Sequence, residues 1–263
     1  MPLTVQAAAA FVADYRNPYE HDDELITWQR DLLSPFGVPF DETLLAQGPN
    51  IGFSELAEQA LRAMPAAVGR PDMVIVTYGM PDWYPFKTIS AYLDYLLGGG
   101  STNFGVSDQG LRAPFTALRI GEAYARSGRC ETLALFVVDQ TTFGYEVPLV
   151  QDLQDSGVFL LFGPAGSLEL SELRSGTDVV ELLGDPGDDT LVVAGPWIDA
   201  DKLDRFTVHQ VPAGSYCTSV WLALAEHHQE WADRYQSVVL CDTDPRTGRS
   251  EIAVLRPSRE ANE

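Results

Sequence analysis

Residues 103–162 read NFGVSDQGLRAPFTALRIGEAYARSGRCETLALFVVDQTTFGYEVPLVQDLQDSGVFLLF, and they carry the clearest fold signal in the chain. A short apolar strand runs into a polar turn at residues 107–110, and the turn opens an amphipathic helix. Gly128 ends this helix, and a strand-forming run follows at 133–138. The pattern predicts a strand–turn–helix–strand unit with the 107–110 turn at a helix N-terminus, near the carboxyl edge of a sheet. Turns in this place commonly hold the reactive group of α/β enzymes.

The composition is that of a globular protein with an acidic surface. Of the 263 residues, 45% are hydrophobic, and 38 acidic residues against 17 basic ones give a net charge of −21. This charge repels nucleic-acid phosphates and anionic lipid, so neither a nucleic acid nor a membrane is expected as a partner. It also disfavours docking of an acidic acyl carrier protein unless a local basic patch receives it.

Targeting and cysteine content predict a reduced, cytoplasmic protein. The N-terminus has no basic region before its apolar residues, and no apolar run reaches the roughly 20 residues of a membrane span. Cys130, Cys217 and Cys241 are too few and too scattered for a disulfide framework or a metal cluster, so no metal site is expected.

The rest of the chain reads as two α/β halves of similar order. Apolar runs at 73–78 and 158–162 predict buried strands of the first half, and runs at 190–194 and 237–241 predict those of the second. A Pro/Gly-rich acidic segment at residues 184–189 predicts a linker. We therefore expect halves at residues 1–183 and 184–263, with the second one shortened. Within them, we expect Ser54 to cap a helix and His227 and His228 to face solvent.

Five segments resemble, in order, the thiolase superfamily and within it the ketoacyl-ACP synthase III type. They are MVIVTYGMPDW (73–83), FGVSDQGLRAPFTALRIGEAYARSGRCETLALFVVDQ (104–140), DSGVFLLFG (155–163), GSYCTSVWLALAE (214–226) and VVLCDTDPRTGRSEIAVL (238–255). The second resembles the nucleophile turn, helix and following strand of the family. The resemblance implies a five-layered αβαβα fold from two pseudo-repeated halves and a dimer formed through the strand beside the turn. It also implies acyl chemistry on CoA or carrier-protein thioesters.

The departures from the family are equally informative. Its condensing enzymes use a thiolate nucleophile at the turn, with a His and an Asn that bind the thioester oxygen. Here the 107–110 turn contains no cysteine, and Gly214 and Ser215 occupy the place of the Asn. His209 and Gln210 imitate a His-Gln pair of the family, but they lie only a few residues before Gly214. The standard catalytic set is therefore absent.

Four polar residues remain as candidates for catalysis or for its remnants. Asp108 can cap the following helix, mimic an acylated state or act as a general base. The resemblance also suggests a role for Gln109. It can replace the nucleophile, as a Gln does in chain-length factors, the noncatalytic partners of some polyketide ketosynthases. His209 is either a packed histidine or an acid–base group. Ser215 could accept an acyl group only if His209 served as its base.

Two cysteines and one aromatic loop complete the candidates. Cys241 is either a small buried residue or the counterpart of the second, proton-shuttling cysteine of thiolases. Cys217 is likewise either a packed residue or one that contacts the substrate. Trp83 and Phe86 belong to a loop that lines an acyl tunnel, forms a dimer interface or packs as ordinary core.

The hypothesis that follows is a degenerate ketoacyl-synthase homologue that acts as a noncatalytic or accessory partner in polyketide, fatty-acid or specialised-metabolite biosynthesis. It would form a homodimer, or a heterodimer with an intact ketosynthase, and would have no cofactor of its own. The alternatives are an acyltransferase or thioester hydrolase that acts on CoA or phosphopantetheine thioesters through a non-standard site, and a dimeric scaffold without an acyl ligand.

Overall fold

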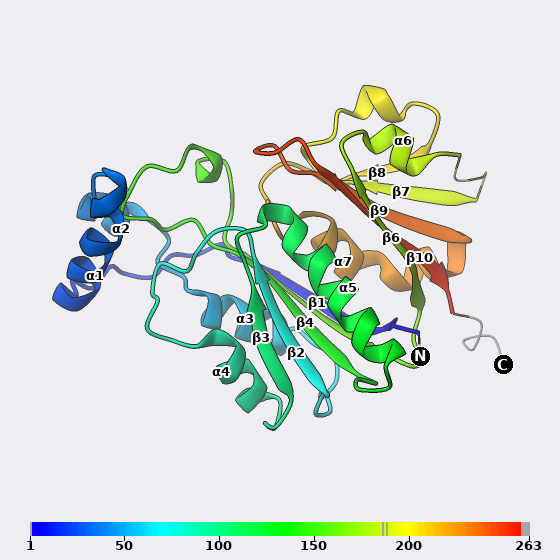
Figure 1. The fold of residues 1–263 in the computed structure, drawn as a ribbon, viewed down its shortest axis with the longest axis horizontal. Coiled ribbons are helices and arrows are strands. Elements are labelled where there is room, and N and C mark those ends of the chain that lie inside the picture. Colours follow the sequence, from blue (N-terminus) through cyan, green and yellow to red (C-terminus); the bar gives the residue numbers. More distant parts are fainter. Residues whose placement is uncertain (1, 186, 188, 259–263) are drawn as a thin grey trace.

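Ten strands form one continuous sheet in the computed structural model, which describes residues 2–185, 187 and 189–258. The strand order is β3-β2-β4-β5-β1-β6-β10-β9-β7-β8 (Figure 1). The strands are β1 (Thr4–Val12), β2 (Met73–Tyr78), β3 (Thr102–Val106), β4 (Leu133–Asp139), β5 (Ser156–Gly163), β6 (Leu168–Gly176), β7 (Thr190–Ala194), β8 (Thr207–Gln210), β9 (Ser237–Thr243) and β10 (Ser250–Pro257). The helices are α1 (Asp23–Leu33), α2 (Glu42–Gln47), α3 (Phe53–Arg62), α4 (Ile89–Leu96), α5 (Ala113–Arg126), α6 (Val179–Leu183) and α7 (Ser219–Arg234), with 3-10 turns η1 (Ser34–Phe36), η2 (Gly110–Arg112), η3 (Pro148–Val150) and η4 (Ala200–Leu203).

The two halves of the sheet repeat one topology. In the first half β2 pairs in parallel with β3 and β4, and β5 pairs antiparallel with β4 and β1. In the second half β7 pairs in parallel with β8 and β9, and β10 pairs antiparallel with β9 and β6. The predicted duplication is therefore present. The topology places its boundary at residues 164–167, between β5 and β6, rather than at Gly184. The expected linker, residues 184–189, joins α6 to β7 within the second half, and its residues 186 and 188 lie outside the described part.

Helices and sheet form five layers. Helices α5 and α7 lie between the two halves of the sheet (Figure 1), and the largest buried cluster joins them to the inner faces of both halves. Helices α3 and α4 cover the outer face of the first half, and α6 covers the outer face of the second. Because the central strands are covered on both faces, they read as continuous apolar runs in the sequence.

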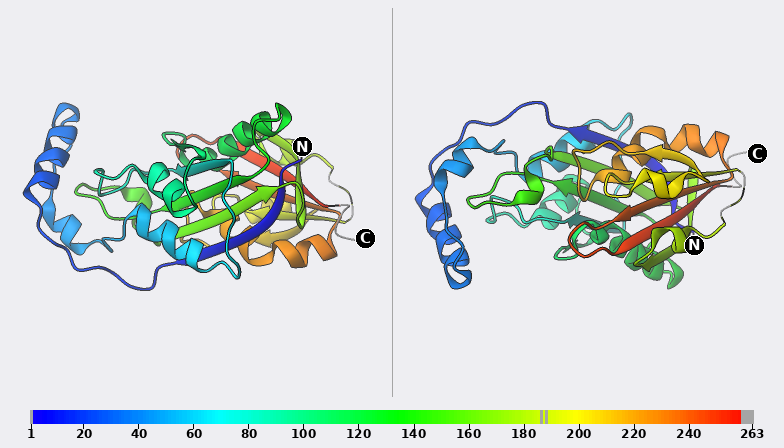
Figure 2. Two further views of the ribbon diagram at one scale, coloured as in Figure 1. Left: turned by 90° about the horizontal axis from the view of Figure 1, so that it is seen from below. Right: turned by 90° about the horizontal axis from the view of Figure 1, so that it is seen from above.

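The second half is the shorter one. The connection from β7 to β8 contains only η4, whereas the matching connection from β2 to β3 contains α4. The first half also carries an extension between β1 and α3, residues 13–52, which we call the arm. Figure 2 shows the arm, with α1 and α2, reaching past the end of the sheet.

Two local predictions are wrong. Helix α3 begins at Phe53 with Gly52 as its N-cap and without a side-chain cap, so Ser54 lies inside the first turn instead of capping it. His228 does not face solvent: it is buried, and its Nδ1 lies 2.8 Å from Ser167 Oγ.

Within the described residues, no helix has the length and apolar character needed to cross a membrane.

A buried carboxylate ties the central layer to the second half of the sheet. Glu251 on β10 has a fully buried side chain. Its Oε1 accepts a hydrogen bond of 2.7 Å from Arg112 Nε, and its Oε2 accepts one of 2.6 Å from Arg119 Nη2. Because Arg112 lies in η2 and Arg119 in the second turn of α5, the two contacts fix the segment that directly follows the 107–110 turn.

Candidate active site

The 107–110 turn lies where the sequence places it. It follows β3 at the carboxyl edge of the parallel strands and leads through η2 into the N-terminus of α5. Two of its residues have left-handed backbone: Asp108 has φ 59° and Gly110 has φ 57°. This is the position in which a strand-to-helix turn presents a nucleophile in α/β enzymes.

The two polar side chains at the centre of the turn, Asp108 and Gln109, do not form a reactive group. Asp108 is exposed, and neither η2 nor α5 has a side-chain cap, so the expectation that Asp108 caps the helix is wrong. Gln109 Oε1 accepts a hydrogen bond of 2.5 Å from Thr116 Oγ1, which ties the amide to the first turns of α5. The turn thus presents a solvated carboxylate and an amide already engaged by its own helix.

A tyrosine and an aspartate fill the space in front of Gly110. The Tyr216 hydroxyl donates a hydrogen bond of 3.0 Å to Asp244 Oδ2, and both side chains are almost fully buried. A Cβ on Gly110 would collide with this hydroxyl and this carboxylate, and a Cβ on Gly79 would press on the Tyr216 ring. The direction in which a side chain at position 110 would project is therefore occupied by the protein itself.

Two more buried carboxylates organise the start of α7 beside this pair. Asp139, at the end of β4, accepts hydrogen bonds of 2.8–3.0 Å from the backbone N–H groups of Tyr216, Cys217 and Thr218. Asp242, on β9, accepts the Ser219 hydroxyl and the Thr243 N–H. Asp139 thus satisfies three backbone donors that would otherwise be orphaned at the N-terminus of α7, and Asp242 ties the Ser219 side chain, at the start of α7, to β9.

Neither predicted cysteine is placed to form a thiolate. Cys217 reaches the turn, with its Sγ 3.7 Å from the Gly110 carbonyl oxygen. Burial, and then the carboxylates of Asp139, Asp242 and Asp244, raise the pKa of the Cys217 thiol well above its usual range. Cys241 belongs to the outer cluster of the second half, on the far side of the sheet from α5 and α7, and burial raises its pKa too. Since the thiolate is the reactive form, both remain inert thiols near neutral pH.

His209 and Ser215 lie together, but away from the turn. Both line a cleft of about 320 Å³ whose other walls include Val12 of β1 and Leu222 of α7. The His209 ring packs against the rings of His227 and Trp231, each with a centroid distance of 5.3 Å, and burial lowers the pKa of His209. No residue of the 107–110 turn is among those that line this cleft.

Trp83 and Phe86 lie next to the arm. Their rings join a chain of edge contacts, with centroid distances of 5.7 Å from Trp83 to Tyr84, 5.3 Å from Tyr84 to Phe86 and 6.2 Å from Phe86 to Trp28. The structure thus distributes the predicted site residues over four places instead of one. Within the described residues, no group of three His, Cys, Asp or Glu side chains is arranged to hold a metal ion.

Burial raises the pKa of four carboxyl groups from an ordinary value of 3.8: to about 7 for Asp82 and Asp242, to about 6 for Asp155, and in the same direction for Asp139. The folded state therefore holds these protons more tightly than the unfolded state. The stability that they contribute is complete below about pH 4 and is lost as the pH rises through the folded pKa values. Burial lowers the pKa of His209 and His228, so these two residues stabilise the fold more at high pH than at low pH. The shifts of the carboxyl groups are larger and decide the direction.

We therefore expect the melting temperature to be higher at about pH 5.5 than at pH 8, by on the order of 5 °C. Circular dichroism during heating measures it. Asp242→Asn should shrink the difference. Asp94→Asn is the control, because hydrogen bonds from Ser101 and Gly100 outweigh burial and hold the pKa of Asp94 below its ordinary value. A melting temperature that rises with pH would contradict the prediction.

Comparison with solved structures identifies the fold. Ketoacyl-ACP synthase III (FabH) from Thermus thermophilus aligns at 14% identity over 96% of this chain and 98% of that chain, with a TM-score of 0.68. FabH from Pseudomonas aeruginosa PAO1 aligns at 15% identity over 98% of both chains, with a TM-score of 0.65. A Cys-to-Ser variant of Xanthomonas campestris OleA, solved with lauric acid and lauroyl-CoA, aligns at 12% identity over 97% of this chain and 99% of that chain, with a TM-score of 0.65.

The chain thus has the thiolase-like fold of the ketoacyl-ACP synthase III enzymes, as the sequence predicted. No protein-family model matches it, and no curated protein matches it in sequence. At these identities the similarity describes the backbone, and the chemistry has to be argued from the residues of this chain.

Proposed function

We propose that this protein is a noncatalytic ketoacyl-synthase-like subunit that acts as an accessory partner, in the manner of a chain-length factor, in polyketide, fatty-acid or specialised-metabolite biosynthesis. The observation that carries the proposal is the filled space at Gly110. A condensing enzyme needs a thiolate in this turn and room for an acyl thioester beside it. Here the turn has no cysteine, Gly110 has no side chain, and the Tyr216–Asp244 pair occupies the space in front of Gly110.

The retained scaffold supports a structural role. The Asp139 contacts to α7 and the Glu251 contacts to α5 hold the two central helices to the sheet although no nucleophile needs positioning. Strand β3 is the outermost strand beside the turn, bonded only to β2 among the described strands, so its other edge is open to a second chain. The resemblance to the family implies a dimer contact at this strand, which supports the proposal. We propose that the partner is an intact ketosynthase, which would supply the active site, the acyl thioester of CoA or phosphopantetheine and the docking of any acyl carrier protein.

The test is co-expression with the ketoacyl synthase encoded nearest to this chain, followed by native mass spectrometry of the purified complex. We expect a 1:1 heterodimer, and a partner whose product chain length or turnover changes when this chain is omitted. A stable homodimer that leaves the co-expressed synthase unbound and unaffected would count against the accessory role.

A second candidate is a thioester hydrolase or acyltransferase with a non-standard site. The observation that favours it is the cleft shared by His209 and Ser215, in which an imidazole of lowered pKa is present as a neutral base at neutral pH. Hydrolysis of acyl-CoA by the pure protein, lost in both Ser215→Ala and His209→Gln, would establish this function and displace the first.

A further inference from the structure

Helix α1 has two apolar sides, and only one of them is packed. Leu25, Ile26 and Leu33 are buried against the body of the protein, where Gln29 Nε2 also donates a hydrogen bond of 3.0 Å to the Trp83 carbonyl oxygen. On the other side, Trp28, Leu32 and Phe36 follow one another at intervals of four residues through α1 and η1, and they are 38%, 50% and 77% exposed. We call these three residues the arm stripe. In a monomeric protein, aligned exposed apolar side chains of this size mark an interaction surface.

A small pocket opens beside the arm stripe. Trp28 and Leu32 form one wall, and the loops that contain Trp83 and Tyr145 form the other, around a volume of about 40 Å³. Asp82 also lines the pocket, and its carboxylate accepts backbone N–H groups of Phe53, Tyr84 and Trp83, with Lys87 close enough to act on its charge. The indole Nε1 of Trp83 is buried and has no hydrogen-bond partner. A buried donor without a partner favours an acceptor, such as a carbonyl oxygen, that enters from outside.

The surroundings of the arm stripe are strongly acidic. The arm contains eight acidic residues and two basic ones. Both basic side chains are engaged within the arm: Arg30 lies over the Phe40 ring at 5.3 Å, and Arg16 donates to the carbonyl oxygens of Ala46 and Gln47. The surface offered to a partner therefore combines exposed apolar side chains with negative charge.

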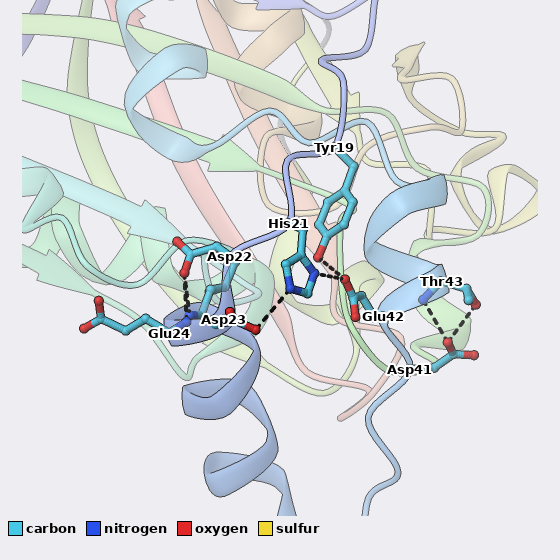
Figure 3. A network of polar contacts seen from close by, with 9 residues as sticks. Tyr19, His21, Asp22, Asp23, Glu24, Asp41, Glu42 and Thr43 are labelled. Carbon is cyan, nitrogen blue, oxygen red and sulfur yellow. Dashed lines mark hydrogen bonds and ion pairs between the residues drawn. The ribbon is translucent and has the colours of Figure 1, made fainter.

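The arm is held in shape before any partner binds. Figure 3 shows His21 between the two arm helices, with Nδ1 2.6 Å from Glu42 Oε1 and Nε2 3.1 Å from Asp23 Oδ1. The Tyr19 hydroxyl donates to the same Glu42 oxygen at 2.8 Å, and Asp22 caps α1 by accepting the N–H groups of Glu24 and Leu25. Binding at the arm stripe would thus require little ordering of this side of the interface.

We infer that the arm stripe docks a basic amphipathic helix of a partner protein, whose apolar face covers Trp28, Leu32 and Phe36 and whose Lys or Arg side chains face the acidic residues of the arm. The negative charge of the arm distinguishes a basic helix from the other molecules that could cover the arm stripe. A second copy of this chain would bring a net charge of −21 against the acidic arm, and an anionic membrane would be repelled in the same way. A cationic helix complements the acidic surroundings and the apolar stripe together. This surface lies apart from the 107–110 turn, so the inference holds whether or not the turn is inert.

Isothermal titration calorimetry of the full chain with a synthetic Lys/Leu amphipathic helix tests the inference, with a Glu/Leu helix of the same pattern as the control probe. We expect a Kd on the order of 10 µM for the basic helix, weakening with salt, and no binding of the acidic one. The double variant Leu32→Ser/Phe36→Ser should weaken binding by about tenfold or more. Tyr95→Ser removes an aromatic side chain that is 76% exposed on α4, and it should change nothing.

Four results would overturn the inference. The first is equal binding by the acidic helix. The second is binding that Leu32→Ser/Phe36→Ser leaves intact while circular dichroism shows a folded protein. The third is a homodimer in size-exclusion chromatography that this double variant converts to a monomer, because the occupant would then be a second copy. The fourth is binding of the protein to phosphatidylcholine or phosphatidylserine vesicles that the same variant abolishes, because the occupant would then be a lipid surface.

Discussion

Replacing Gly110 with alanine is expected to destabilise the protein by about 3 kcal/mol or more. The backbone at Gly110 is left-handed, and an alanine costs about 1–2 kcal/mol in that region. The new Cβ would also displace the Tyr216 hydroxyl from the Asp244 carboxylate, and an unsatisfied buried polar group costs about 1–3 kcal/mol. Denaturant unfolding followed by circular dichroism measures the change.

Gly37→Ala is the matched control. Gly37 has φ 66°, and nothing lies within 4 Å of where its Cβ would be, so it carries the backbone cost alone. We expect a loss of about 1–2 kcal/mol there. In an Asp244→Ala background, Gly110→Ala should cost less than in the original protein, because the collision has been removed. Equal losses at Gly37 and Gly110 would show that the space in front of Gly110 is open.

Replacing Glu251 with alanine is expected to cost about 3–5 kcal/mol, the usual effect of breaking a buried ion pair by removing one partner. The side chain of Glu251 is fully buried, and it is the shared acceptor of Arg112 and Arg119, so its loss leaves two partly buried guanidinium groups unpaired. Chemical denaturation gives the free energy of unfolding.

The control is an exposed ion pair on α5, the helix that carries Arg119. Glu122 pairs with Arg126 one turn away at 3.1 Å, with side chains 36% and 67% exposed, and Glu122→Ala should cost about 0.5 kcal/mol or less. A Glu251 variant as stable as the Glu122 variant would contradict the role given to this ion pair.

The fold was readable from the sequence because its signals are local. Strands covered on both faces leave unbroken apolar runs, such as 133–138, and the helix after the 107–110 turn shows its own period. The duplication was visible in the order of these elements. The boundary between the halves was misplaced because a Pro/Gly-rich segment at 184–189 resembles a linker, whereas the true boundary is the short turn between β5 and β6.

The position of the candidate site was predictable, and its content was not. Whether the space at Gly110 is open depends on Tyr216 and Asp244, which reach it only through the packing of the second half. Two signals were available: a glycine inside the turn, and aspartates near the ends of β4 and β9, which hold equivalent places in the two halves of the sheet. Asp139 and Asp242 lie at the N-terminus of α7 because the topology brings the ends of their strands there. Local sequence patterns do not encode this placement.

Incubation of the pure protein with acyl-CoA and acyl-carrier thioesters, followed by intact mass and free-thiol determination, tests most directly whether the 107–110 turn is inert. An intact ketoacyl-ACP synthase III treated in parallel should gain the mass of one acyl group. For this chain we predict an unchanged mass and three free thiols, at Cys130, Cys217 and Cys241. A covalent acyl adduct, or thioester turnover that Asp108→Ala or Cys217→Ala abolishes, would contradict a noncatalytic role.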